Sequence, residues 1–193
     1  MKMMNKKALL VVFCVLLPIL IVLFSYEMVF AFSSYDAEQQ GVLDAMKEFK
    51  PCCEEGVSIE GMTLEEESHL GDVRRVMVAI DFVFLVLLFV CAVMVSLYYK
   101  KRKELGKLFY WGGIVSGLVV IVVGLLGVIS FNWLFTIFHE IFFPQGNWQF
   151  AVDSMLIQTF PLQFFIWMLV KIVLLSLVLA SFFILGSIYL KKK

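Results

Sequence analysis

Long apolar stretches alternate with polar segments along the chain. Four stretches are almost free of charged residues, at about residues 8–30, 76–99, 108–130 and 161–190. An α-helix rises about 1.5 Å per residue, so about 20 apolar residues cross the roughly 30 Å hydrocarbon core of a bilayer. Each stretch is long enough to do so. The pattern therefore predicts four membrane-spanning helices.

The two longest polar segments, residues 31–75 and 131–160, both follow an odd-numbered span and so emerge on one side of the membrane. In the first, Thr63 and Glu66 have the spacing of a capping box, in which a hydroxyl and a carboxylate each bond a free backbone N–H at a helix start. The predicted helix carries His69 and Asp72 on one face and runs into the second span. A shorter amphipathic helix is expected over residues 36–49.

The second polar segment, residues 131–160, is unusually rich in Phe and Trp, yet it also contains His, Asn and a Pro-Gln-Gly-Asn turn. Amphipathic rings concentrate where hydrocarbon meets water. His139 lies in its middle and has helical spacing to Phe135, Phe142 and Phe143. This segment therefore predicts the floor of an active site at a membrane surface.

Composition and charge place the chain in the membrane and orient it. Hydrophobic residues make up 62% of the sequence, and the mean hydropathy is +0.94. Lys and Arg gather near the N-terminus, in residues 100–107 and at the C-terminus, whereas residues 33–73 are strongly acidic. Basic segments stay cytoplasmic. We expect one all-α domain over residues 1–193 in the cytoplasmic membrane of a cell, with cytoplasmic termini and a small extracellular cap. An acidic outer surface does not suit nucleic acid.

Small residues follow one another along the third span. Gly113 and Gly117 form a GxxxG pair, and Gly124 and Gly127 continue the row. Such rows let two helices approach closely in a membrane. A ligand groove along the glycines is the alternative interpretation.

Polar residues also recur at one membrane depth. Counted from the cytoplasmic ends, Glu27, Asp81 and Lys171 fall near the outer hydrocarbon boundary, and Asn132 lies slightly higher. Ionisable groups at such depth often mark a functional site. The simpler alternative is that Lys171 reaches toward the membrane surface or forms a packing ion pair with Asp81 or Glu27.

The cysteines do not indicate a disulfide framework or a metal site. Cys14 and Cys91 lie in apolar stretches, where a thiol acts as a small hydrophobe. Cys52 and Cys53 are adjacent, and neighbouring cysteines rarely bridge each other. A thiol–quinone oxidoreductase, often also a four-span protein, would need Cys-x-x-Cys pairs that the sequence lacks. No metal or cofactor is predicted.

The chain contains two histidines, His69 and His139, and both belong to the predicted cap. Imidazole titrates near neutrality, so one ring can accept a proton while another donates one. A Ser or Cys nucleophile next to a histidine is not evident. The pattern suits a reaction in which the substrate supplies its own nucleophile, and Asp72 is the candidate that orients His69.

Three motifs then resemble the lipoprotein intramolecular transacylase family: EESHLGDV, FHEIFFPQGNWQF and LIQTFPLQFF. The resemblance implies a four-helix membrane protein with an extracellular cap. It implies transfer of an acyl chain from the sn-2 ester of a lipoprotein's diacylglyceryl group to the amino group of its N-terminal Cys. The partners would be that lipoprotein and the bilayer, and the catalytic pair would be His69 and His139. A non-catalytic four-span interaction protein remains the alternative.

The remaining candidates surround this pair. Five polar residues are predicted to support the reaction: Asp72, Arg74, Asn132, Asn147 and Lys171. Arg74 and the two asparagines are candidates for stabilising an oxyanion. Aromatic walls to confine the diacylglyceryl group are predicted from Trp133, Phe138, Phe142, Phe143, Trp148 and Phe150.

Overall fold

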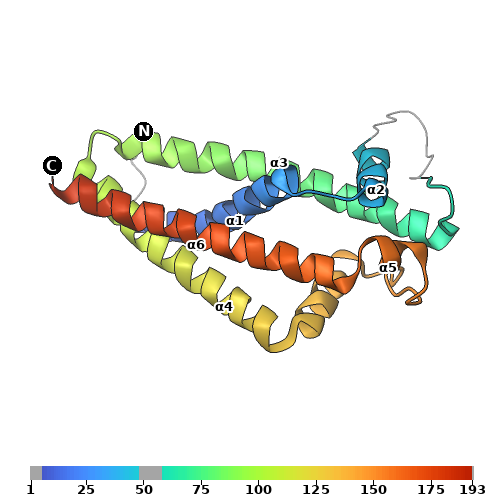
Figure 1. Ribbon diagram of the computed structural model, residues 1–193. Coiled ribbons are helices and arrows are strands. Elements are labelled where there is room, and N and C mark those ends of the chain that lie inside the picture. The colour runs from blue at the N-terminus through green and yellow to red at the C-terminus, as the bar shows by residue number, and fades with distance from the viewer. Residues whose placement is uncertain (1–5, 48–57, 193) are drawn as a thin grey trace.

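The computed structural model describes residues 6–47 and 58–192, and every regular element in these ranges is a helix. Four long helices run side by side as an elongated bundle (Figure 1): α1 (Lys6–Phe32), α3 (Leu64–Tyr98), α4 (Arg102–Phe142) and α6 (Leu162–Lys192). Each is long and apolar enough to cross a membrane. The predicted class, an all-α protein with four transmembrane helices, is confirmed.

Two short helices, α2 (Ala37–Lys47) and α5 (Met155–Thr159), lie together at one end of the bundle (Figure 1). The predicted amphipathic helix at residues 36–49 corresponds to α2. Its buried face, Val42 and Met46, packs with Leu70 of α3 and Leu156 of α5. This small hydrophobic core, separate from the packing of the four long helices, holds the cap together.

The opposite end of the bundle carries the basic clusters. Lys6 Nζ lies 3.2 Å from Glu104 Oε1, so the start of α1 contacts the first turn of α4, next to its connection with α3. The C-terminal end of α6 lies at this end too (Figure 1). The three predicted cytoplasmic segments thus lie on one side and the cap on the other.

Two of the long helices extend beyond their apolar parts. The first three turns of α3, residues 64–75, are polar and belong to the cap. In α4 the backbone leaves helical geometry at Ser130 (φ −157°, ψ 83°), after which residues 131–142 continue as helix in a new direction (Figure 1). Residues 76–98 of α3 and the part of α4 that precedes Ser130 are thus the apolar parts of these two helices. Both histidine-bearing segments lie beyond them, toward the cap.

The glycines of α4 pack mainly against α6, but not as the GxxxG pair predicts. A Cβ atom on Gly113 would lie 2.9 Å from the Ala180 carbonyl oxygen, and one on Gly127 would lie 2.6 Å from a Leu169 methyl group. A Cβ atom on Gly117 would meet nothing within 4 Å. Gly113 therefore permits close approach of the helices, while Gly117 does not take part.

Gly113→Ala and Gly117→Ala form a matched pair of variants. We expect Gly113→Ala to lower the unfolding temperature in detergent, because its methyl group meets the backbone of α6 and the helices must separate. Gly117→Ala should leave it unchanged or raise it, since alanine favours helix by about 1 kcal/mol over glycine. Equal effects in thermal unfolding of the two variants would contradict this packing.

The predicted polar layer separates into two contacts. Lys171 Nζ donates to Ser33 Oγ at 3.1 Å, whereas Glu27 lies beside Asp81. An ion pair of Lys171 with Asp81 or Glu27 is not among those formed by the described residues. Lys171 instead ties α6 to the end of α1.

The structure describes two of the four cysteines. Cys14 and Cys91 are free thiols within α1 and α3. Cys52 and Cys53 lie outside the described residues.

Candidate active site

The polar start of α3 positions the first histidine. Thr63 N donates to Glu66 Oε2 at 2.8 Å and Glu66 N donates to Thr63 Oγ1 at 3.3 Å, which confirms the predicted capping box. Because the box fixes where the helix begins, it also fixes which side of its first turns faces the cap interior. His69 lies there, only 6% exposed.

Glu66 has a second contact that the sequence does not indicate. Its Oε1 accepts a 2.8 Å hydrogen bond from the backbone N–H of Leu156, at the start of α5. The side chain is 2% exposed. Burial would raise the pKa of Glu66, but the hydrogen bonds from Thr63 and Leu156 outweigh it and hold the pKa below the usual value. A buried carboxylate thus docks the second cap segment onto α3.

The second histidine lies on the segment of α4 beyond Ser130. His139 Nδ1 is 2.8 Å from the carbonyl oxygen of Phe135. A carbonyl oxygen can only accept, so Nδ1 carries the proton and Nε2 has a free lone pair. The ring centroid lies 4.0 Å from Phe135, 4.8 Å from Trp148 and 5.4 Å from Phe138. Aromatic side chains therefore hold this ring in place.

The two imidazoles face each other inside the cap. Their ring centroids are 6.1 Å apart and their planes are inclined by 25°. Phe143 contacts both, with centroid distances of 4.8 Å to His69 and 5.4 Å to His139. Phe150 lies 5.6 Å from His69. His139 is 8% exposed, so a pair of nearly buried histidines is enclosed by aromatic rings.

This enclosure keeps both rings uncharged. Burial, and next the neighbouring His139, lower the pKa of His69 to about 4, although Asp72 opposes the shift. Burial also lowers the pKa of His139. Near neutral pH each imidazole is therefore neutral and able to accept a proton.

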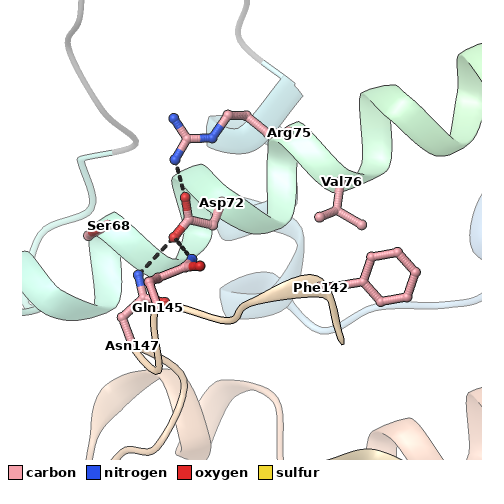
Figure 2. Close-up of a pocket in the computed structure, with 7 residues that line it drawn as sticks. All are labelled: Ser68, Asp72, Arg75, Val76, Phe142, Gln145 and Asn147. Carbon is pink, nitrogen blue, oxygen red and sulfur yellow. Dashed lines mark hydrogen bonds and ion pairs between the residues drawn. The ribbon is translucent and has the colours of Figure 1, made fainter. Parts of the chain in front are cut away.

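Asp72 connects α3 to the turn that follows α4 (Figure 2). Its carboxylate accepts hydrogen bonds from Gln145 Nε2 at 2.6 Å and Asn147 Nδ2 at 2.8 Å, and it pairs with Arg75. The predicted Pro-Gln-Gly-Asn turn is present, and Gly146 has φ +80°, a conformation that glycine adopts without strain. The turn directs both amide side chains at the carboxylate.

A surface cavity of about 490 Å³ opens beside this cluster (Figure 2). Its lining is mainly polar and consists of Ser68, Asp72, Arg75, Val76, Phe142, Gln145 and Asn147. Asn147, which lines this cavity, also raises the pKa of His69, against the larger effect of burial. The cavity is thus next to the histidine pair, although neither imidazole lines it.

The structure brings together most, but not all, of the predicted site residues. Asn132 and Trp133 are exposed and make none of the ring contacts or hydrogen bonds described for the histidines, and Lys171 bonds Ser33 instead. Arg75, rather than its neighbour Arg74, pairs with Asp72. Of the aromatic residues, Phe138, Phe143, Trp148 and Phe150 contact a histidine, whereas Phe142 lines the polar cavity.

Sequence reasoning did not assign Gln145 and Arg75 to the site. It named Phe135 only for its helical spacing to His139, and Glu66 only for the capping box. No cluster of three or more His, Cys, Asp or Glu side chains suited to a metal ion occurs among residues 6–47 and 58–192.

Comparison with known proteins decides the family. The family described as lipoprotein intramolecular transacylase Lit matches residues 53–165. The chain belongs to this family. The matched region of this transacylase family member begins in the first cap segment and ends in the first turn of α6. It therefore contains both histidines.

Solved structures share the fold of this family member. The membrane-integral lipoprotein intramolecular transacylase Lit from Bacillus cereus superposes with a TM-score of 0.78 at 19% identity, covering 97% of this chain and 96% of that one. A variant of the same protein with one histidine replaced by alanine gives a TM-score of 0.77 at 18% identity, with coverage of 97% and 94%. These likenesses extend over nearly the whole of both chains.

A relative from Aquifex aeolicus, an uncharacterised protein, is 27% identical over 105 residues. The match covers 53% of this chain and 45% of the relative. This chain therefore spans less than half the length of that curated relative.

Proposed function

We propose that this protein is a lipoprotein intramolecular transacylase that moves an acyl chain from the sn-2 glyceryl ester of a lipoprotein to the amino group of its N-terminal Cys. The observation that supports this most directly is the pair of neutral imidazoles, 6.1 Å apart in an aromatic enclosure at the end of a membrane-spanning bundle. Family membership supplies the reaction class.

The reaction needs one proton to change place. The neutral amine attacks the ester carbonyl carbon, so that a nitrogen–carbon bond forms. The bond from that carbon to the glyceryl oxygen breaks. The amine loses a proton and the glyceryl oxygen gains one, so the atoms balance without water, metal or another reactant. Two histidines at the reacting carbonyl can carry that proton.

The electrostatics of the pair favour this transfer. Nε2 of His139 is free to accept the amine proton, because Nδ1 is committed to the Phe135 carbonyl. An imidazolium buried here, beside a second imidazole, is a stronger acid than in water, since burial lowers its pKa. It therefore releases the proton readily to the departing glyceryl oxygen.

The surroundings of the pair suit the two ends of a lipoprotein. Phe138 and Phe142 remain 43% and 44% exposed, and their rings offer apolar surface to the acyl chains. The polar cavity beside Asp72 and Gln145 suits the peptide that follows the lipidated Cys. In the free lipoprotein, the amine must reach the ester through a large cyclic transition state, which is improbable. An enclosed site that holds ester and amine together makes this encounter favourable through proximity.

The charge distribution supports a cap on the extracellular side. The start of α1, the α3–α4 connection and the end of α6 are basic and lie at the bundle end opposite the cap. Positive segments remain in the cytoplasm. Both termini would then be cytoplasmic, and the site would face the outer leaflet, where diacylglyceryl lipoproteins are anchored.

Expression in a bacterium that makes diacylglyceryl lipoproteins but lacks N-acylation tests the function. We expect N-terminal peptides carrying one acyl chain on the amine and one remaining on the glyceryl group, detected by mass spectrometry. The total acyl count should not change, because the transfer is intramolecular. Peptides that keep a free amine and two ester-linked chains, in cells with well-expressed protein, would contradict the proposal.

A further inference from the structure

The side chain of Asn147 bonds the carboxylate of Asp72, which lies one helical turn after His69 on α3. Its Nδ2 is 2.8 Å from Asp72 Oδ2. Burial would raise the pKa of Asp72, but hydrogen bonds from Asn147, Arg75 and Gln145 hold it below the usual value, so the carboxylate is ionised and only accepts. This contact fixes which end of the amide is nitrogen. The amide oxygen of Asn147 is therefore turned away from Asp72.

Two buried polar atoms in this corner lack a hydrogen-bond partner among the described residues: Asn147 Oδ1 and His69 Nδ1. His69 is 94% buried, being 6% exposed. A buried polar atom left unpaired costs about 1–3 kcal/mol. Asn147 raises the pKa of His69, against the larger effect of burial. A hydrogen bond from Nδ1–H to Oδ1 would give both atoms a partner.

We propose that Asn147, held by Asp72, accepts a hydrogen bond from Nδ1–H of His69 and fixes the tautomer whose Nε2 is unprotonated. Asn147 is then a positioning residue and not an oxyanion donor. It does for His69 what the Phe135 carbonyl does for His139. Both rings present an Nε2 lone pair for the reaction. The catalytic meaning of this inference rests on the proposed acyl transfer, but the tautomer itself does not.

Nitrogen-15 NMR of histidine-labelled protein measures the tautomer directly, and the chain has only two histidines to assign. We expect both rings to carry the proton on Nδ1. In Asn147→Leu the His69 ring should shift toward the Nε2–H form that free imidazole favours, while His139 stays unchanged. Gln145→Leu is the matched control, because it removes another hydrogen bond to Asp72 without removing the acceptor next to His69.

A second variant keeps an acceptor in place. Asn147→Gln retains an amide N–H for Asp72 and an oxygen for Nδ1, so His69 should stay in the Nδ1–H form. A wild-type His69 protonated on Nε2 would overturn the proposal. So would an unchanged His69 ring in Asn147→Leu, or the same shift in Gln145→Leu.

Activity gives a separate measurement. Asn147→Leu should slow acyl transfer by about 10²- to 10⁴-fold, the range of a lost acid–base group. The expected ring signals in a protein that forms no lyso-form lipoprotein would count against the proposed function alone. Equal activity of Asn147→Leu and wild type would overturn the positioning role.

Discussion

His69→Ala and His139→Ala are each expected to abolish acyl migration while leaving the bundle folded. In the proposed reaction, each variant removes one of two neutral imidazoles that carry the amine proton, and loss of such a group costs about 10²- to 10⁴-fold in rate. The readout is the N-terminal lipopeptide of a lipoprotein, analysed by mass spectrometry after co-expression. It should retain two ester-linked chains and a free amine.

The double variant provides the control for mechanism. Residues that act as one unit are strongly non-additive, so His69→Ala combined with His139→Ala should be no slower than either single variant. The four spans do not depend on these side chains, which lie in the cap, so membrane levels should match wild type. Unchanged lyso-form product in either single variant would remove that histidine from the mechanism.

Glu66→Ala is expected to have the second largest effect, on both stability and activity. It leaves the buried N–H of Leu156 without its acceptor and removes the capping bond to Thr63. The unpaired buried group costs about 1–3 kcal/mol and the lost cap about 0.5–2 kcal/mol, so we expect a loss of about 2–5 kcal/mol in the free energy of cap unfolding. With α5 undocked, the second cap segment no longer holds Phe150 against His69. Thermal unfolding and the lipopeptide assay measure the two consequences.

Glu65→Ala is the matched control. Glu65 belongs to the same helical turn but is exposed, and exposed substitutions usually change stability by less than about 0.5 kcal/mol. The two variants remove the same side chain from adjacent positions. If they lower the unfolding temperature equally, the carboxylate of Glu66 does not dock the cap.

The hydrophobic pattern was sufficient for the fold because a bilayer permits few alternatives. Backbone polar groups must be satisfied internally in hydrocarbon, so apolar stretches of this length become helices. The capping box at Thr63 also worked, since both its partners lie within one turn. The Gly113–Gly117 pair misled because a sequence shows spacing on one helix but not which side the neighbouring helix occupies.

In the candidate site, too, local contacts could be predicted from the sequence, whereas contacts between distant residues could not. The two histidines could be selected from the sequence because imidazole titrates near neutrality. Asp72 could be selected because it lies one helical turn after His69. The contact of Glu66 with Leu156 joins residues 90 positions apart, and no local rule indicates it. Adjacent residues of similar type, such as Arg74 and Arg75, differ only in the side of the helix on which they lie and in their tertiary neighbours. Only the three-dimensional structure shows which of the two contacts Asp72.

The break at Ser130 divides α4 into two parts under different constraints. Before it, the helix must keep its small side chains against α6 to preserve the anchor. Beyond it, the helix carries the rings around His139, of which Phe135 also contacts Phe165 of α6, with 5.4 Å between ring centroids. Phe138 and Phe142 pack against each other and beside His139, so substitutions there can reshape the surroundings of the histidine pair with little effect on the anchor, and the two parts of one helix can evolve at different rates.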